Sequence, residues 1–314
     1  MESLNIKLAE KMKELNNKLG YDLSNIKNFN RDYLRDQLKC YGSFINLRKL
    51  ERDELEKFSK MACIDGSVNR FGSSHPHYID VYQGLAKVSK SSLADVILSD
   101  VYSPLTSNLS DDEEDLKKKL LARIEILTGL ETLKTYDLDY LLMDGNLIRY
   151  TIEDKENFDK LIGQCLEKDV LLAGFIKEPK TNILGELIFK DSQQLKLYDK
   201  DILYGILNEG EGYILDDSYN KKVDQGFSSM FLRTASYPGV TGLEVLEGQR
   251  ASLYNIANLC YSLTPQMSRG VPLIIDMVDK EVKIDDKLMR EIVLAYLDSD
   301  LVERFFRSER SMRR

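Results

Sequence analysis

Two short segments of the chain each carry an apolar run directly into an aspartate, a glycine and a small polar residue. The first segment ends in Asp65-Gly66-Ser67 and the second in Asp144-Gly145-Asn146. Each is typical of a buried strand that stops at a carboxylate, with a glycine that allows a tight turn or a close approach to a ligand. Two such strand ends predict that Asp65 and Asp144 lie together and bind a divalent cation.

The bland alternative is that each Asp-Gly pair is an ordinary turn, which is the commoner role of this dipeptide after an apolar run. We favour the metal-binding role for Asp65 and Asp144 because the arrangement occurs twice and because the order of the predicted strands agrees with it. Crowded carboxylates repel one another and shift their pKa values when no metal is bound.

The composition is that of a globular protein, with 314 residues, 43% of them hydrophobic and 31% charged. No apolar run approaches the roughly 20 residues of a membrane helix, and no signal peptide is visible. The net charge of -8 argues against a protein that coats nucleic acid, but not against a nuclease with an acidic metal site. The four cysteines form no Cys-x-x-Cys pair, so we expect free thiols in a reducing cytoplasm.

The elements that must position the two acids are five strands and the helices between them. We expect strands from residue 61, at 78–86, at 95–102, at 139–144 and at 169–177, with helices from 108–114 to about 133 and at 155–166. This order favours an antiparallel meander of three strands, followed by two parallel strands added through helical crossovers.

Outside this sheet the patterns favour helices and one strand. Helices are expected at 3–19, 47–61, 199–208, 247–263 and 286–308, and a strand at 228–237. No internal repeat or low-complexity linker divides the chain, so we expect one compact domain with helical additions at both ends.

Five segments in order along the chain resemble the NurA family of DNA-repair nucleases, which are RNase H-like enzymes. They are Ile64–Ser67, Arg123–Ile126, Leu141–Leu147, Ala173–Lys177 and Gly270–Lys280. The resemblance implies an α/β fold with an RNase H-like mixed five-stranded sheet, flanking helices and additional N- and C-terminal helical elements. It divides the chain into an N-terminal helical region at 1–60 and a nuclease domain at 61–314 with a helical C-terminal part.

The resemblance also implies a set of site residues. Asp65, Glu125 and Asp144 are expected to bind divalent metal, as two ions of manganese or magnesium. Asp279 lies where many family members carry a histidine, so it can ligate a hard cation but cannot replace the proton transfer of a histidine. Lys177 ends the fifth strand, where it neutralises a phosphate or orients a water molecule.

The residues themselves leave open whether Glu125 or Glu131 is the helical ligand. If the aliphatic stripe at positions 116, 120, 124 and 127 is the buried face, Glu125 lies off that face, where a solvated glutamate is usual. Glu131 lies nearer the stripe. The resemblance favours Glu125.

The function that the resemblance implies is a metal-dependent DNA nuclease, active as a 5′–3′ exonuclease and a single-strand endonuclease. It is expected to act in DNA end resection and double-strand break repair. The expected partners are DNA, single-stranded and at duplex ends, a HerA-type hexameric ATPase, and a second copy of the chain in a cytoplasmic homodimer. The chain has no Gly-x-x-x-x-Gly-Lys-Ser/Thr motif for hydrolysing ATP itself.

The chemistry suits this site, because two divalent ions about 3.5–4 Å apart activate water, stabilise charge on the phosphoryl oxygens and assist the leaving oxygen. Two alternatives stay open. One is a catalytically inactive RNase H-like scaffold that binds a translocase or DNA, and the other is a nuclease that acts on RNA or branched junctions.

Overall fold

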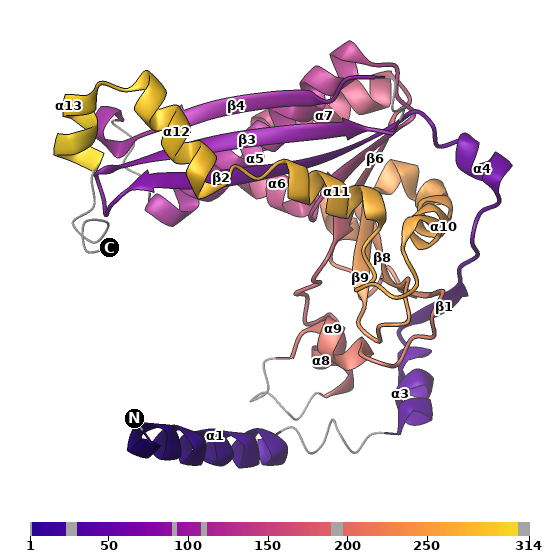
Figure 1. Cartoon of the computed structure of the whole chain (residues 1–314). Helices are drawn as coiled ribbons and strands as arrows, with labels where there is room; N and C mark the ends of the chain where they lie inside the picture. The colour runs from indigo at the N-terminus through magenta and orange to yellow at the C-terminus, as the bar shows by residue number, and fades with distance from the viewer. Residues whose placement is uncertain (1, 23–29, 90–92, 108–111, 190–196, 307–314) are drawn as a thin grey trace.

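A single mixed sheet runs through the computed structural model, with helices on both of its faces (Figure 1). The structure describes residues 2–22, 30–89, 93–107, 112–189 and 197–306. Among these residues the sheet has nine strands in the order β1-β7-β8-β9-β6-β5-β2-β3-β4. No described helix is both long and apolar enough to span a membrane.

The strands are β1 (Gly42–Asn46), β2 (Met61–Gly72), β3 (Tyr78–Val88), β4 (Val96–Tyr102), β5 (Tyr140–Asp144), β6 (Leu171–Ile176), β7 (Glu211–Leu215), β8 (Phe227–Arg233) and β9 (Thr241–Leu246). The α-helices are α1 (Glu2–Asp22), α3 (Arg31–Leu38), α4 (Arg52–Glu56), α5 (Glu113–Thr135), α6 (Ile148–Glu153), α7 (Lys155–Glu167), α8 (Ile183–Ile188), α9 (Asp199–Leu203), α10 (Leu253–Leu263), α11 (Leu273–Glu281), α12 (Asp286–Tyr296) and α13 (Ser299–Leu301). Short helical turns are η1 (Pro104–Thr106), η2 (Val223–Gln225), η3 (Glu247–Ser252) and η4 (Val302–Phe306).

The half of the sheet from β4 to β6 has the predicted topology, but β2 does not stop at Asp65 as expected and continues to Gly72. Strands β2, β3 and β4 form an antiparallel meander, while β5 runs parallel to β2 and β6 parallel to β5. The expected number of five strands is wrong, because β9, β8, β7 and β1 continue the sheet beyond β6 in antiparallel pairs. Strand β1 lies in the first 60 residues, a region that we expected to be helical.

The expected helix at 47–61 is wrong except for the single turn of α4. Its apolar residues are spaced as in a helix, but they contact the core between the sheet and α10 from a largely non-helical segment. Leu47 and Leu50 precede α4, Leu55 lies in it, and Phe58 lies in the turn that follows. The expected helix at 286–308 is interrupted, since α12 ends at Tyr296 and α13 begins at Ser299. Residues 108–111 and 307–308, parts of two expected helices, lie outside the described residues.

Helix α1 forms over the predicted residues, but its described apolar side chains are exposed. Leu8 is 62% exposed and Met12 57%. This helix therefore adds nothing to the core.

Alternation along β2 divides the core into two layers. Ala62 and Ile64 pack with α5 and α7 on one face of the sheet. Met61 and Cys63 point the other way and pack with α10 and α11. Side chains of a strand alternate between faces, so the residue after Ile64 must face α11.

A pair of glycines lets α5 lie close against the first face. Gly66 of β2 is paired with Gly84 of β3. A Cβ atom at Gly84 would lie 2.2 Å from Thr128 Oγ1 and 3.0 Å from the carbonyl oxygen of Ile124. Both neighbours belong to α5, so the glycines set how near this helix comes to the strand that carries Asp65.

We predict that Gly84→Ala lowers the free energy of unfolding by about 1–3 kcal/mol, because the added methyl group overpacks the contact with α5. Urea denaturation followed by circular dichroism measures the change. Gly163→Ala is the matched control, since nothing lies within 4 Å of a Cβ there. In the middle of α7 it should be neutral or stabilising by up to about 1 kcal/mol. Equal effects of the two variants would contradict the close packing of α5.

Candidate metal centre

The strand register brings Asp65, Asp144 and Lys177 to one face of the sheet. Ile64 is opposite Met143 in the parallel pair β2–β5, and Asp144 is opposite Phe175 in β5–β6. Asp65 and Asp144 therefore lie side by side on adjacent strands, at the level where β5 ends. Lys177 lies two residues after Phe175 and shares its face. This is the face on which Cys63, Leu142 and Phe175 pack against α10 and α11.

Helix α11 adds a third carboxylate, that of Asp279. Its apolar side chains Ile275 and Val278 are fully buried against the sheet. The carbonyl oxygen of Val282, just beyond the helix, accepts hydrogen bonds from Ser67 Oγ at 2.6 Å and Gln83 Nε2 at 3.3 Å. Ser67 follows Asp65 by two residues on β2, so the strand that carries one acid also fixes the helix that carries another.

Three of the four predicted acids come together. One carboxylate oxygen of each of Asp65, Asp144 and Asp279 lies within 4.8 Å of the other two. The Lys177 ammonium bridges two of them, at 2.5 Å from Asp144 Oδ2 and 2.9 Å from Asp279 Oδ1. Lys283 also pairs with Asp279, at 2.7 Å.

These acids are charged unequally. Burial, together with the charges of Asp144 and Glu125, raises the pKa of Asp65 to about 8. Burial also raises the pKa of Asp144, although Lys177 opposes it. Burial would raise the pKa of Asp279 too, but its hydrogen bonds from Lys283 and Lys177 outweigh this and lower the pKa.

Glu125 approaches from the opposite face of the sheet. A Cβ at Gly66 would lie 2.7 Å from its Oε1, so this glutamate lies directly behind the residue that follows Asp65. Its side chain is 2% exposed. The expectation of a solvated glutamate at this position is therefore wrong, because α5 is buried both against the sheet and against α6 and α7.

Glu131, the rival helical ligand, lies elsewhere. Its side chain is 44% exposed and pairs with Lys134 at 3.1 Å, one turn further along α5. Neither glutamate belongs to the group of converging carboxylates, but Glu125 lies against Gly66 on the strand of Asp65, so the geometry favours Glu125 over Glu131.

The turn after Asp144 is fixed by contacts that sequence reasoning did not find. Gly145 has a φ of +130° and donates its N–H to Phe175 O at 2.8 Å. The N–H of Leu147 donates to the fully buried Glu244 of β9 at 2.7 Å. Glu244 also pairs with Lys222 at 2.5 Å. An isolated glutamate in a strand carries no sequence signal for this role.

Two further residues that the sequence did not single out as site residues hold Glu125. Arg149 of α6 and the hydroxyl of Tyr150 both donate to Glu125 Oε2, the latter at 2.7 Å. Tyr150 is completely buried. A single arginine and a single tyrosine, three and four residues after Asn146, carry no sequence signal for this role.

The donor set fits a hard divalent cation. Such an ion lies about 2.0–2.1 Å from each oxygen in octahedral geometry, so oxygens on one ion are about 3–4 Å apart. The three carboxylates need only a small inward movement to reach that spacing, and the Lys177 ammonium already lies between two of them. Burial, together with the neighbouring carboxylates, raises the pKa of Asp65 and of Asp144, and a bound cation would favour their ionised forms.

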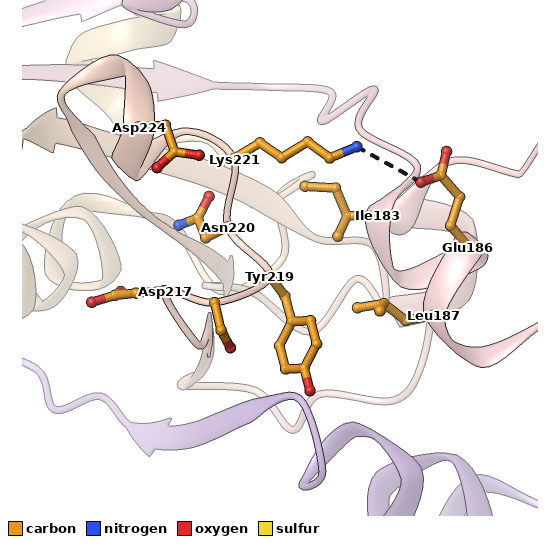
Figure 2. Close-up of a pocket in the computed structure, with 9 residues that line it drawn as sticks. Ile183, Glu186, Leu187, Asp217, Tyr219, Asn220, Lys221 and Asp224 are labelled. Atoms are coloured by element: carbon orange, nitrogen blue, oxygen red, sulfur yellow. Dashed lines mark ion pairs between the residues drawn. The ribbon is translucent and has the colours of Figure 1, made fainter.

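A separate hollow of about 210 Å³ lies between α8 and the segment after β7 (Figure 2). Lys221 reaches across it to Glu186 at 4.0 Å, and Tyr219, Ile183 and Leu187 supply apolar lining. None of the predicted site residues lines it.

Comparison with solved structures gives only distant likenesses. Endonuclease V from Bacillus subtilis is 14% identical with a TM-score of 0.43, over 86% of this chain and 96% of that chain. Human endonuclease V is 16% identical with a TM-score of 0.38, over 86% and 99%. Endonuclease V from Ciona intestinalis, in complex with a DNA that contains inosine, is 16% identical with a TM-score of 0.37, over 90% and 99%. No curated protein matches the sequence.

A protein-family model gives the decisive comparison. The model described as the NurA domain matches residues 59–284. This range includes β2, α5, β5 and α11, which carry the four predicted acids, and Lys177 directly after β6. The chain therefore belongs to the NurA domain family.

Proposed function

We propose that this protein is a metal-dependent deoxyribonuclease whose centre is the cluster of Asp65, Asp144 and Asp279. The observation that carries the proposal is the convergence of these three carboxylates from β2, β5 and α11 to within 4.8 Å of one another. Membership of the NurA domain family supports a nuclease. We propose Mn²⁺ or Mg²⁺ as the cofactor, because hard cations prefer carboxylate oxygens.

Each residue has a distinct part in the proposal. Asp65, Asp144 and Asp279 hold cation, with Glu125 as a further ligand. A bound cation polarises the phosphoryl oxygens and lowers the pKa of an attacking water molecule. Lys177 pairs with Asp144 and Asp279 in this structure, and with a cation on these carboxylates its ammonium would be available to a phosphate oxygen.

The surroundings of the cluster favour a phosphodiester as substrate despite the net charge of -8. Lys283 and Arg269 lie at its rim with exposed side chains, the former paired with Asp279 and the latter with Asp276 at 2.6 Å. The acidic charge around Asp279 and Asp276 is thus balanced locally. The positively charged side chains of Lys283 and Arg269 are thus placed to attract an approaching DNA backbone.

Family membership supports the finer parts of the proposal. These are 5′–3′ exonuclease and single-strand endonuclease activity, a role in DNA end resection and double-strand break repair, a HerA-type hexameric ATPase as partner, and a homodimer. The described cysteines are free thiols, which suits a cytoplasmic location. An inactive scaffold, or a nuclease acting on RNA or branched junctions, remains the alternative outcome of the assays below.

We predict that Asp65→Asn and Asp144→Asn each reduce Mn²⁺-dependent cleavage of labelled single-stranded and duplex DNA by at least about 100-fold. Each removes a ligand charge that is worth several kcal/mol in the transition state. Excess EDTA should abolish wild-type cleavage. Asp217→Asn is the control, since this exposed aspartate pairs with Arg250 away from the cluster, and its activity should stay at the wild-type level.

Cleavage that survives EDTA, or that the Asp65 and Asp144 variants retain, would reject the proposed centre. Absence of cleavage by the wild type with either Mn²⁺ or Mg²⁺ would favour the inactive scaffold. The same assay on labelled RNA and on branched DNA separates the remaining alternative.

A second prediction concerns pH. Asp65 has its pKa raised to about 8 in the metal-free protein, so below pH 8 a proton must leave before a cation binds. Mn²⁺ affinity should therefore rise by up to about tenfold per pH unit from pH 6 to 8 and level off above it. Calorimetry in buffers of different ionisation enthalpy should detect the released proton. In Asp65→Asn the pH dependence should be much shallower, and an unchanged slope in that variant would contradict the assignment.

A further inference from the structure

Glu125 is held at one oxygen by two donors. Both the Arg149 guanidinium and the Tyr150 hydroxyl donate to Oε2. Arg149 also lies over the Tyr150 ring, with its Cζ 4.6 Å from the ring centroid, and its Nη2 is 3.1 Å from the Tyr150 hydroxyl. The carboxylate thus has a full positive counter-charge in a place where water is excluded.

The cluster of Glu125, Arg149 and Tyr150 lies against the two glycines that follow the metal-centre aspartates, Gly66 and Gly145. Glu125 Oε1 would lie 2.7 Å from a Cβ at Gly66, and Arg149 Nε would lie 3.6 Å from a Cβ at Gly145. Gly66 follows Asp65 and Gly145 follows Asp144. The Arg149 guanidinium therefore lies beside the residue that follows Asp144. Glu125 itself does not belong to the group whose carboxylate oxygens converge within 4.8 Å.

The charges around the centre are paired in a way that leaves one acid out. Lys177 forms ion pairs with both Asp144 and Asp279, and Arg149 forms one with Glu125. Within the described ranges, Asp65 forms no ion pair. Binding of a first cation is therefore favoured beside Asp65. Binding of a cation at Glu125 is opposed by the positive charge of the Arg149 guanidinium, which already contacts that carboxylate.

Arg149 has a second carboxylate within reach. Glu153 lies four residues further along the chain, at the end of α6. Its Oε2 is buried and has no hydrogen-bond partner, and Arg149 Nε is likewise buried and unpartnered. Residues four apart on a helix face one another, so a rotation of the Arg149 side chain would satisfy both atoms.

We infer that Arg149 withholds Glu125 from the metal centre, so that a first cation binds Asp65, Asp144 and Asp279, and a second binds only as Arg149 moves from Glu125 to Glu153. The inference rests on the proposed function and deepens it. It makes the two cation sites unequal, and it assigns the difference to Arg149, a residue that contacts neither cation.

Mn²⁺ binding to the full chain without DNA tests this inference, with free Mn²⁺ measured by electron paramagnetic resonance. Wild type should bind one ion tightly and a second more weakly. Arg149→Gln should strengthen the second site by about tenfold or more, because a charged competitor for Glu125 is gone. Glu153→Gln should weaken it by about threefold or more, because the guanidinium loses its alternative partner. Neither substitution should change the first site.

Three controls accompany these variants. Arg149→Lys keeps the positive charge and should remain close to wild type. Glu125→Gln should remove the second site and leave the first intact. Lys155→Gln alters a neighbouring basic residue that pairs with Asp159 on the exposed side of α7, and it should change neither site.

Two results would overturn the inference while leaving the nuclease proposal in place. One is a weaker second site in Arg149→Gln, which would make Arg149 an orienting partner of a ligand. The other is a wild type that binds two equal ions and does not respond to Arg149→Gln. If Arg149→Gln fails to fold by circular dichroism, unchanged second-site affinity in Glu153→Gln overturns the inference instead. Absence of Mn²⁺ binding by wild type, or unchanged binding by Asp65→Asn, rejects the metal centre itself.

Discussion

The proposed metal centre depends on one constraint: the backbone holds the carboxylates of Asp65, Asp144 and Asp279 close together although their charges repel. The parallel register of β2 and β5 places Asp65 beside Asp144 at the same level of the sheet, and α11 adds Asp279 from above. A slip of one residue in either strand would exchange the side chains that pack against α5 with those that pack against α11, so this proximity cannot relax. The acids therefore stay together, and their charge has to be neutralised by protons, by Lys177 or by bound cation.

The close approach of elements around this cluster depends on glycines where side chains would collide. Gly66 and Gly84 let α5 bring Glu125 against the strand of Asp65 from the opposite face. Gly145, with a positive φ, turns the chain away immediately after Asp144, so that α6 can return Arg149 beside it. The proposed metal centre and the proposed role of Arg149 both follow from this packing. Because Gly66 and Gly145 have no side chains, Glu125 and Arg149 can lie close to the strands that carry Asp65 and Asp144.

The part of the fold that sequence could predict is the part with clean periodicity. Apolar runs into Asp-Gly identified β2 and β5, and the order of strands and helices predicted the topology around them. Only β5 ends at its aspartate; β2 continues past Asp65 to Gly72, because all of these residues pair with β3. Strand β9 was missed because all six of its residues are buried, which leaves no alternation to distinguish it from other apolar runs. Strand β1 is five residues long and pairs with β7, more than 160 residues away, so nothing local reveals it.

The site was predictable to the same extent and for the same reason. The Asp-Gly pattern and the strand order predicted Asp65 and Asp144. Lys177 was expected from the family resemblance of the segment that ends the fifth strand. Asp279 and Glu125 came from family resemblance, and the apolar pattern of α5 misplaced Glu125 because a helix covered on two sides has no single stripe. Glu244, Arg149 and Glu153 act through contacts distant in sequence or through a buried charge, and single residues of these types carry no pattern.

The claim that Asp65 and Asp144 share a divalent cation is tested most directly by anomalous diffraction from crystals soaked in Mn²⁺. The account predicts a manganese peak within about 2.2 Å of a carboxylate oxygen of each residue. A peak bound to only one of the two, or well-ordered side chains at both positions with no peak between them at saturating Mn²⁺, would contradict it.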